Sequence, residues 1–287
     1  MRLVAYDDGR VGQLLGDNRV APVADCMRAV IEQWARDETL PVVASLDTVA
    51  LHDLDVRPPL VDPSKIIAAP VNYRDHQAEM NVDAQVEALG FFLKAPSSVL
   101  DPGGTIQLPY HDRRFDQEGE LAVVIGRTAS KVSEQDALTY VFGYTGLLDI
   151  TMRGGEDRST RKSFDTFTPM GPVLVTADEF GDPGDVELRC WVNDELRQHA
   201  NTSDLIWDVA KLIAYASSVT TLLPGDIITT GTPAGVGPIA AGDDIRLELS
   251  GLGLPLTARV AAEGAVACPT SGRDRAPVSP AISIAHQ

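Results

Sequence analysis

The sequence predicts an α+β protein dominated by β-structure, and three observations support this fold class. Short runs of β-branched and apolar residues, separated by turn residues, recur between residues 65 and 260. Only two helical patterns interrupt these runs, whereas a doubly wound or barrel α/β fold requires a helix after most strands. With 287 residues, 44% of them hydrophobic, the chain can bury the core of one large domain with a small appendage.

Residues 1–62 are predicted to form a small N-terminal α+β domain. The apolar runs 2–6 and 11–15 flank an acidic turn that contains a glycine, which is typical of a hairpin. Apolar residues then recur at intervals of three and four over residues 26–35, as in an amphipathic helix. We expect a larger domain to span residues 63–262.

In the larger domain the β-runs are short, and two helices are expected. Ser133 can cap the first helix, because Asp136 follows three residues later. The second helix is expected over residues 203–219, where apolar side chains recur at helical spacing. Residues 263–287 contain several prolines and show no periodicity, so this tail is expected to be extended or disordered. The expected strands are 66–69, 121–126, 173–175, 227–230 and 245–249.

The balance of charges excludes several classes of partner. The chain has 24 lysines and arginines against 41 acids, which gives a formal net charge of −17. This charge repels the phosphates of nucleic acids and of anionic membranes, so neither is an expected partner. The three cysteines are widely spaced and are expected to stay reduced. No apolar run has the length of a signal peptide or a membrane span, so we expect a cytoplasmic protein.

Segment 115–126 carries the most informative pair of acids. If this segment forms a strand, Glu118 and Glu120 point to the same side, and both faces of the strand continue into apolar residues. Such a strand is expected in the centre of a sheet. Two carboxylates at the edge of a core repel each other and are costly to desolvate unless a cation lies between them. The alternative is a solvated rim on an edge strand.

A third acid, Asp149, ends the apolar segment 144–149 just before a polar loop. An acid at this position is also common as a turn or helix cap, which is the alternative explanation. If the three acids form one cluster, they supply carboxylate oxygens without an accompanying histidine or cysteine. Such a set of ligands favours magnesium, manganese or calcium over zinc.

Two further segments contain candidate catalytic groups. His76 and Glu79 would share one face of a short helix, where a carboxylate can orient an imidazole that acts as a general base for water. The alternative is an ordinary pair on the surface of a helix. Lys162 begins the polar segment 162–172, where it would neutralise an enolate or bind a carboxylate, or simply remain solvated.

A glycine-rich segment, 231–237, follows an apolar run, and residues 235–240 formally fit a dinucleotide-binding fingerprint. A further strand is expected where that fingerprint requires a helix, so we reject a Rossmann site. The glycines are not followed by the lysine of a P-loop. Neither a dinucleotide nor a nucleoside triphosphate is therefore an expected ligand.

Taken together in order, five segments resemble the fumarylacetoacetate hydrolase family, and the similarity extends from about residue 65 to residue 260. The segments are NYRDHQAE, FDQEGELAVVIG, GYTGLLDITMR, KSFDTFTPMGP and PGDIITTGTPAGVG. The resemblance implies a rolled mixed β-sheet, similar to a sandwich, in a protein that is usually a homodimer. It also implies a divalent metal, Mg²⁺ or Mn²⁺, with Ca²⁺ as a further occupant in crystals, and small 2-oxo or diketo acids as substrates.

The resemblance also implies roles for individual residues. Lys162 would stabilise an enolate, and Thr232 would hold the carboxylate of the substrate through its hydroxyl or its amide. His76 and Glu79 match the family's water-activating pair, on a segment that often closes over the substrate. The implied site residues are His76, Glu79 and Lys162 for catalysis, Arg153, Gly231 and Thr232 for substrate binding, and Glu118, Glu120 and Asp149 for the metal.

These roles imply a hydrolase that cleaves a carbon–carbon bond in acylpyruvates or in β-diketo acids of the fumarylacetoacetate type. His76, oriented by Glu79, would deprotonate the water that attacks the distal carbonyl, and pyruvate would leave as an enolate. The same enolate can form by loss of CO₂ from oxaloacetate, so the alternative is an oxaloacetate decarboxylase or a related tautomerase, dehydratase or lyase. A candidate from another class is a noncatalytic β-rich binding protein with a structural calcium ion.

Three departures from the family pattern concern the shape of the site. Gln117 stands where a tyrosine is usual, and Glu156 stands where a glutamine is often found. The extra acid would repel an anionic substrate unless it is turned outward. Residues 68–71 also differ from the commoner pattern, so this loop is expected to suit a different substrate tail.

Overall fold

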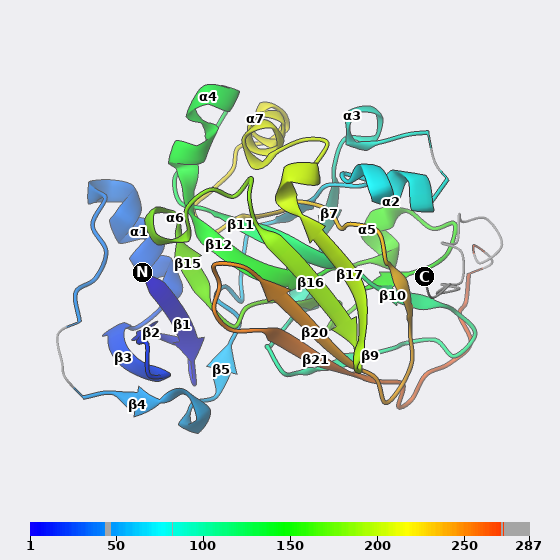
Figure 1. The fold of residues 1–287 in the computed structure, drawn as a ribbon, viewed down its shortest axis with the longest axis horizontal. Helices are drawn as coiled ribbons and strands as arrows, with labels where there is room; N and C mark the ends of the chain where they lie inside the picture. Colours follow the sequence, from blue (N-terminus) through cyan, green and yellow to red (C-terminus); the bar gives the residue numbers. More distant parts are fainter. Residues whose placement is uncertain (44–46, 82, 271, 273–287) are drawn as a thin grey trace.

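The computed structural model describes residues 1–43, 47–81, 83–270 and 272, and its largest element is a mixed sheet of eleven strands (Figure 1). In chain order these strands are β1 (Arg2–Tyr6), β2 (Arg10–Leu14), β3 (Arg19–Ala24), β4 (Val49–Ala50), β5 (Val56–Arg57), β6 (Ile66–Ala68), β7 (Phe92–Lys94), β11 (Gly119–Ile125), β12 (Val141–Leu148), β15 (Leu174–Thr176) and β18 (Ile227–Thr229). Their order in the sheet is β4-β3-β2-β1-β15-β12-β11-β18-β6-β7, with β5 paired to β1. Neighbouring strands are antiparallel except for β18 and β6, which are parallel.

A second sheet of five strands packs against the first, through contacts of its central strands with β11 and β12. Its strands are β9 (Thr105–Gln107), β16 (Glu187–Val192), β17 (Glu195–Asn201), β20 (Asp244–Leu249) and β21 (Leu256–Ala261), in the order β17-β16-β20-β21-β9. Two smaller sheets contain β10 (Phe115–Gln117), β13 (Thr151–Met152) and β19 (Gly237–Ile239), and β8 (Val99–Leu100) and β14 (Thr168–Pro169). This arrangement confirms the predicted mixed, β-rich α+β fold.

The helices of the described chain are short and lie around the sheets. The α-helices are α1 (Met27–Asp37), α2 (Arg74–Glu79), α3 (Val86–Leu89), α4 (Glu134–Ala137), α5 (Arg158–Arg161), α6 (Ala177–Phe180) and α7 (Val209–Val219). Single 3₁₀ turns are η1 (Leu51–Asp53), η2 (Pro96–Ser98), η3 (Leu138–Tyr140) and η4 (Thr202–Asp204). Among the described helices, none is long and apolar enough to cross a membrane.

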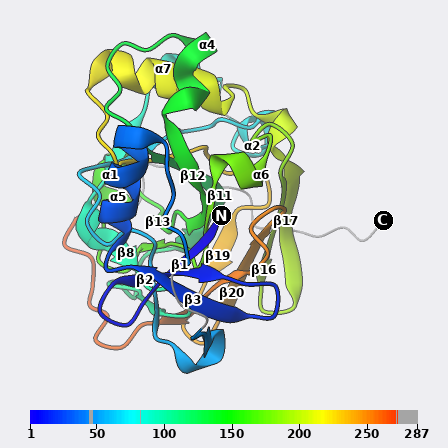
Figure 2. The ribbon, with the colours of Figure 1, turned by 90° about the vertical axis from the view of Figure 1, so that its left-hand side faces the viewer.

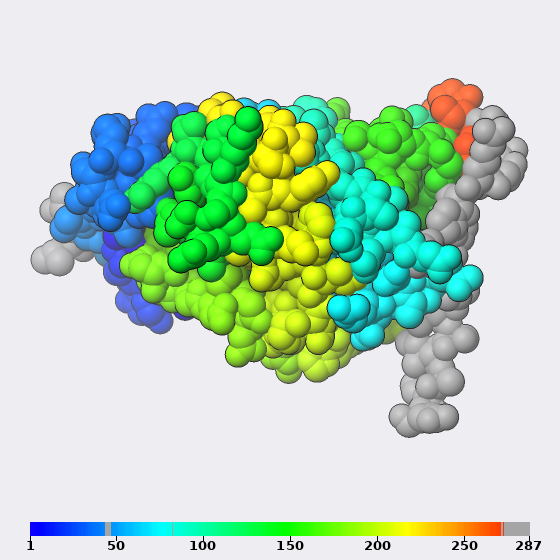
Figure 3. All heavy atoms as spheres, turned by 90° about the horizontal axis from the view of Figure 1, so that it is seen from above, coloured from blue at the N-terminus to red at the C-terminus, as the bar shows by residue number. Residues whose placement is uncertain are grey.

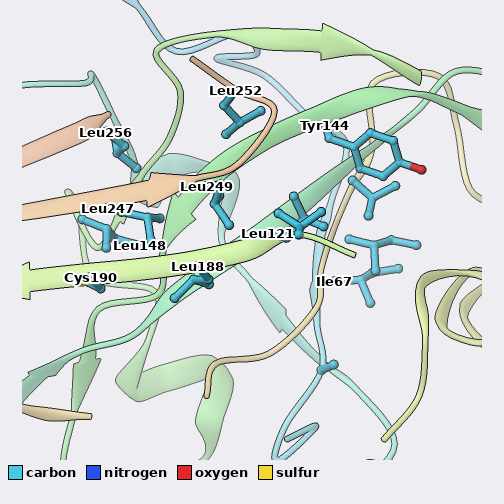
Figure 4. Close-up of a cluster of buried hydrophobic side chains, with 14 of the residues drawn as sticks. Ile67, Leu121, Tyr144, Leu148, Leu188, Cys190, Leu247, Leu249, Leu252 and Leu256 are labelled. Carbon is cyan, nitrogen blue, oxygen red and sulfur yellow. The ribbon is translucent and has the colours of Figure 1, made fainter. Parts of the chain in front are cut away.

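The core is organised around β11, which lies between β12 and β18 as a central strand. Alternate side chains of β11 enter two different hydrophobic clusters, Leu121 in one and Ala122 in the other. On the first side, Leu121 and Leu148 meet Leu188 and Leu247 of the second sheet (Figure 4). The second side is covered by apolar residues of α1. Both faces of β11 are thus buried, as its sequence predicts.

Helix α7 supports the segment that contains α2 and α3. Figure 3 shows α4, α7 and this segment side by side on one face of the molecule. On α7, the ring of Tyr215 packs edge-on against Phe91 at 5.8 Å and against Trp207 at 5.3 Å, measured between ring centroids. These contacts connect the segment after α3 to the body of the protein.

Most of the expected elements are confirmed. The hairpin is β1 and β2, the helix expected over 26–35 is α1, and each of the five expected strands is present. Ser133 caps α4, because its Oγ accepts a hydrogen bond from the Asp136 N–H at 3.2 Å. The three cysteines are not in disulfides; Cys190 is buried, which raises its pKa to about 12, and Cys26 is exposed.

The prediction of a helix over residues 203–219 is wrong for residues 203–208, because α7 begins only after Asp208. The Asp208 side chain accepts a hydrogen bond from the Lys211 N–H at 2.8 Å and caps the helix there. The preceding residues form η4 and an extended stretch, in which the Ile206 and Trp207 N–H groups donate to Asn72. Tertiary hydrogen bonds have therefore replaced the helix that the local spacing favours.

The N-terminal elements lie at one end of the molecule (Figure 1), which is the end that faces the viewer in Figure 2. They are not separated from the remaining sheet, since β1 pairs with β15, Arg2 opposite Val175. The boundary at residue 62 between a small N-terminal domain and a larger domain is therefore kept as a proposal. Of the predicted tail 263–287, residues 271 and 273–287 lie outside the described residues.

Candidate active site

Three buried carboxylates meet beside the central strands. Glu118 connects β10 to β11, Glu120 lies on β11, and Asp149 directly follows β12. The Asp149 N–H donates to the Glu118 carbonyl at 2.8 Å, which holds the end of β12 beside the start of β11. One ligand oxygen from each carboxylate lies within 4.8 Å of the other two, and the residues are only 5%, 2% and 0% exposed. A solvated rim of an edge strand is therefore excluded.

The charges around these acids fit a metal site. Burial opposes ionisation of Glu118, but Lys162 and Arg153 outweigh it and hold the pKa of Glu118 well below its usual range. At Glu120, burial and the nearby charge of Asp149 raise the pKa to about 8. Without a bound metal ion this cluster thus retains a proton at neutral pH. Three converging carboxylates are the ligands that a hard divalent cation prefers, so the residues fit the implied metal.

Two predicted cations lie against the carboxylates. The Nζ of Lys162 donates to Glu118 Oε2 at 2.6 Å and to Asp149, and it lies 5.2 Å from the centroid of the Phe92 ring. The guanidinium of Arg153 donates to Asp116 at 2.6 Å and to Glu118 at 3.1 Å. Lys162 is therefore a buried, paired cation rather than a solvated one.

Lys94 is a cation of the site that the sequence analysis missed. It ends β7, is buried, and donates from Nζ to Asp149 and to the Phe167 carbonyl, the latter at 3.0 Å. Burial, opposed by the charge of Asp149, lowers the pKa of Lys94. The sequence carries no local signal for this role, because the burial of Lys94 and its pairing with Asp149 depend on where β7 lies in the fold.

His76 and Glu79 form a hydrogen-bonded pair on α2, with 3.0 Å between Nδ1 and Oε2. His76 is only 6% exposed and lines the same cavity as the three carboxylates. The other oxygen of Glu79 accepts the N–H of Gly235 at 3.0 Å, which fixes the carboxylate. This is not an ordinary surface pair. Because Nδ1 is engaged, Nε2 is the nitrogen that remains for a water molecule.

Asn72 anchors the segment that leads into α2. Its side chain is fully buried and donates to the carbonyls of Trp207 at 2.9 Å and Thr230 at 2.8 Å. Its Oδ1 accepts the Trp207 N–H at 2.8 Å. The extended stretch before α7 therefore positions the chain four residues ahead of His76. Closure of this segment over a substrate stays a prediction.

The glycine-rich loop lies beside Glu118 because β19 pairs with β10, which places Gly237 opposite Gln117. Gln117 donates to the Gly235 carbonyl at 2.9 Å and accepts the Gly237 N–H at 3.1 Å. Gly235 has φ +95°, and a Cβ there would lie 1.8 Å from a backbone oxygen of the neighbouring strand. The unusual glutamine therefore holds the loop whose Gly235 orients Glu79.

The two predicted substrate contacts on this loop differ in their placement. The Thr232 hydroxyl donates to the Gly119 carbonyl at 3.0 Å and accepts from Gln198 at 2.7 Å, so its proton is already used. Of the two groups considered for a substrate carboxylate, this arrangement favours the amide. The Gly231 N–H donates to Glu120 Oε2 at 3.0 Å and thus positions a carboxylate of the cluster.

Most predicted site residues converge on one cavity of about 270 Å³; Glu79 and Gly231 support it from outside its lining. Glu156 does not line the cavity, since it bonds Arg113 at 2.6 Å and Thr270. The outward orientation considered for this acid is the one observed. The lining residues are Ala69, Pro70, Val71, His76, Met80, Ala84, Leu89, Phe92, Glu118, Glu120, Asp149, Arg153, Arg158, Arg161, Lys162 and Thr232.

In comparisons with known proteins, residues 65–261 match the fumarylacetoacetate (FAA) hydrolase C-terminal family. The maleylpyruvate hydrolase of Aquipseudomonas alcaligenes is 45% identical over 230 residues, which cover 76% of this chain and 79% of that protein. The mitochondrial oxaloacetate tautomerase of Xenopus laevis is 35% identical over 259 residues, covering 84% and 81%.

Among solved structures, maleylpyruvate hydrolase from Sphingobium sp. SYK-6, in complex with manganese(II) ion and pyruvate, superimposes with a TM-score of 0.80. The two sequences are 38% identical, and the match covers 91% of this chain and 99% of that one. A divalent metal in a structure this similar agrees with the buried acidic cluster found here.

Proposed function

Since the chain belongs to the fumarylacetoacetate hydrolase family, we propose that it is a divalent-metal-dependent enzyme that hydrolyses a carbon–carbon bond in acylpyruvates. The observation that carries this proposal is the His76–Glu79 pair, which lies on the same cavity as the three carboxylates. A general base for water is needed for hydrolysis, whereas decarboxylation and tautomerisation through an enolate need no attacking water.

We assign Glu118, Glu120 and Asp149 as the ligands of Mg²⁺ or Mn²⁺. When bound, the metal would act as a Lewis acid that binds the 2-oxo acid and favours its enolate. A noncatalytic calcium site is less well supported, because His76 and Lys162 would then have no reason to line the same cavity.

Residues of the chain carry out the other steps of the proposed reaction. His76 removes a proton from water through Nε2, and Glu79 fixes the imidazole through Nδ1 and stabilises its protonated form. Lys162 supplies positive charge beside the position where the enolate oxygen develops. Thr232 binds the substrate carboxylate through its amide, and Arg153 orients Glu118.

A second candidate is interconversion of the keto and enol forms of oxaloacetate, or its decarboxylation. It is supported by the similarity to the tautomerase of Xenopus laevis. Both candidates require the metal and Lys162, but only hydrolysis requires His76 as a base for water. Removing the imidazole therefore separates hydrolysis from decarboxylation, which forms the enolate without a base. Tautomerisation is recognised by its product, because it neither cleaves acetylpyruvate nor releases CO₂.

The test compares His76→Ala with a matched control, His199→Ala, in the full-length protein loaded with Mn²⁺. His199 also contacts a glutamate, at 2.8 Å, but the pair is exposed on β17 and does not line the cavity. Acetylpyruvate and oxaloacetate are followed by ultraviolet absorbance. We expect His76→Ala to lose about 100-fold or more of acetylpyruvate hydrolysis, while His199→Ala is unchanged. A wild-type protein that consumes only oxaloacetate would favour the second candidate.

Two further proposals concern the oligomeric state of the enzyme and its location in the cell. We propose that it works as a homodimer, as the family resemblance implies, and in the cytoplasm. The tests are the molar mass of the purified protein in solution and fractionation of the cells that produce it. A purely monomeric active enzyme would contradict the first proposal.

A further inference from the structure

Two arginines of α5 line the cavity without an acidic partner among the described residues. Arg158 and Arg161 are three residues apart on this helix and contribute to the same wall. The other two cations of the lining, Arg153 and Lys162, are each paired with two carboxylates. The arginines of α5 therefore remain available to an anion that the described chain does not provide.

Arg161 is the more confined of the two. Its Nε is buried and has no hydrogen-bond partner in the described structure. Burial, together with the positive charge of Arg153, lowers the pKa of Arg161, and the more distant charges of Glu118 and Asp149 oppose this shift only in part. A guanidinium nitrogen withdrawn from water without a partner is costly, and a carboxylate matches the planar set of donors to which it belongs.

In the part of the chain that the structure describes, the two acids that precede α5 form no ion pair with its arginines. Glu156, two residues before Arg158, accepts a hydrogen bond from Arg113 at 2.6 Å. Asp157 is the N-cap of α5, and its Oδ1 accepts the Ser159 N–H at 2.8 Å. The local acids are thus used in the architecture of the loop rather than in the cavity.

We propose that Arg161 and Arg158 bind a second carboxylate, at the distal end of the substrate, and so select acylpyruvates that are dicarboxylic acids. This inference rests on the proposed function, in which the first carboxylate is held by the metal and Thr232. Arg153 is not available for the second one, because it is bonded to Asp116 and Glu118.

The rest of the lining suits the chain between the two carboxylates. Met80, Leu89 and Phe92 give the cavity an apolar surface beside its charged groups. A hydrocarbon spacer can pack there while charged groups at its ends are bound by fixed cations. A substrate with a neutral acyl group would fill the apolar part but leave the two guanidinium groups without a partner.

The experiment compares acetylpyruvate, which lacks a distal carboxylate, with succinylpyruvate, which carries one. Both are assayed with the Mn²⁺-loaded wild type, Arg161→Gln, Arg158→Gln and the control Arg36→Gln, which removes the same charge from the exposed end of α1. We expect Arg161→Gln to lower kcat/KM for succinylpyruvate by about tenfold or more, mainly through KM. Acetylpyruvate should change less than about twofold, as should both substrates with Arg36→Gln.

Equal losses on both substrates, or no loss on either, would overturn the inference. If Arg161→Gln does not fold, Arg161→Lys replaces it, with a smaller loss expected because the paired donors of the guanidinium are absent. If the wild type cleaves neither compound, the proposed function fails. The arginine site is then tested separately, by calorimetric measurement of the binding of each compound to the Mn²⁺-loaded protein. Tighter binding of succinylpyruvate that Arg161→Gln abolishes supports the arginine site; equal binding of both compounds overturns it.

Discussion

Replacing Glu120 by glutamine should have opposite effects on the metal-free protein and on metal binding. Glu120 accepts the Gly231 N–H through Oε2, a bond that an amide oxygen can keep. The amide NH₂ can then donate toward Asp149, as a protonated carboxyl would. The substitution therefore keeps this group neutral at every pH while preserving the shape of the cluster.

The magnitude follows from the pKa of Glu120, which is about 8 in the folded, metal-free protein against an ordinary value of 4.5. A carboxyl whose pKa rises on folding stabilises the fold fully below its unfolded pKa, and that stability is lost as the pH rises through the folded pKa. At pH 7 the folded chain must take up a proton that the unfolded chain has lost, at a cost of about 3 kcal/mol. Glutamine avoids this cost.

The assay is urea unfolding between pH 4.5 and pH 8.5, after chelation of metals, with thermal melting in the presence and absence of Mn²⁺. We expect Glu120→Gln to be up to about 3 kcal/mol more stable than the metal-free wild type at pH 7 and equal to it near pH 4.5. Mn²⁺ should raise the Tm of the wild type much more than that of the variant. A metal-free variant that is less stable at pH 7 and still gains stability from Mn²⁺ would refute the reasoning.

Three other perturbations have expected outcomes. Lys162→Met should lower kcat for acetylpyruvate by about 100-fold or more, in steady-state assays, because the enolate loses its nearby cation. Glu156→Gln should leave kcat/KM within about twofold but lower the unfolding free energy in urea by about 2 kcal/mol, since Arg113 loses a buried partner; a large loss of activity would contradict this placement. Gly235→Ala should lower the Tm and hydrolysis far more than Gly242→Ala, which shares φ +95° but meets open space.

The sequence predicts the central part of the fold because local and tertiary preferences agree there. β11 has apolar residues on both faces, so both faces can be buried only if the strand lies in the middle of a covered sheet, and it lies there. The stretch before α7 was not predictable, because helical spacing over 203–208 competes with hydrogen bonds to Asn72, a residue about 130 positions earlier in the chain.

In the candidate site, too, local patterns predict some of the residues, whereas tertiary contacts determine the others. Glu118 and Glu120 were expected to share a face because the side chains of a strand alternate with a period of two. Asp149 was expected in the site because an apolar run ends at this acid. Lys94 was missed, since its role depends on β7 lying near the end of β12, which no local pattern encodes. The orientation of Glu156 likewise depends on Arg113, 43 residues away in the sequence.

The most direct test of the central claim is the identity and ratio of the products formed from acetylpyruvate by the Mn²⁺-loaded, full-length protein. Nuclear magnetic resonance of the reaction mixture measures pyruvate and acetate together over time. We expect equal amounts of the two products, and none after chelation of the metal. Disappearance of the enol absorbance without acetate, or product formation that persists after complete removal of the metal, would contradict metal-dependent carbon–carbon hydrolysis.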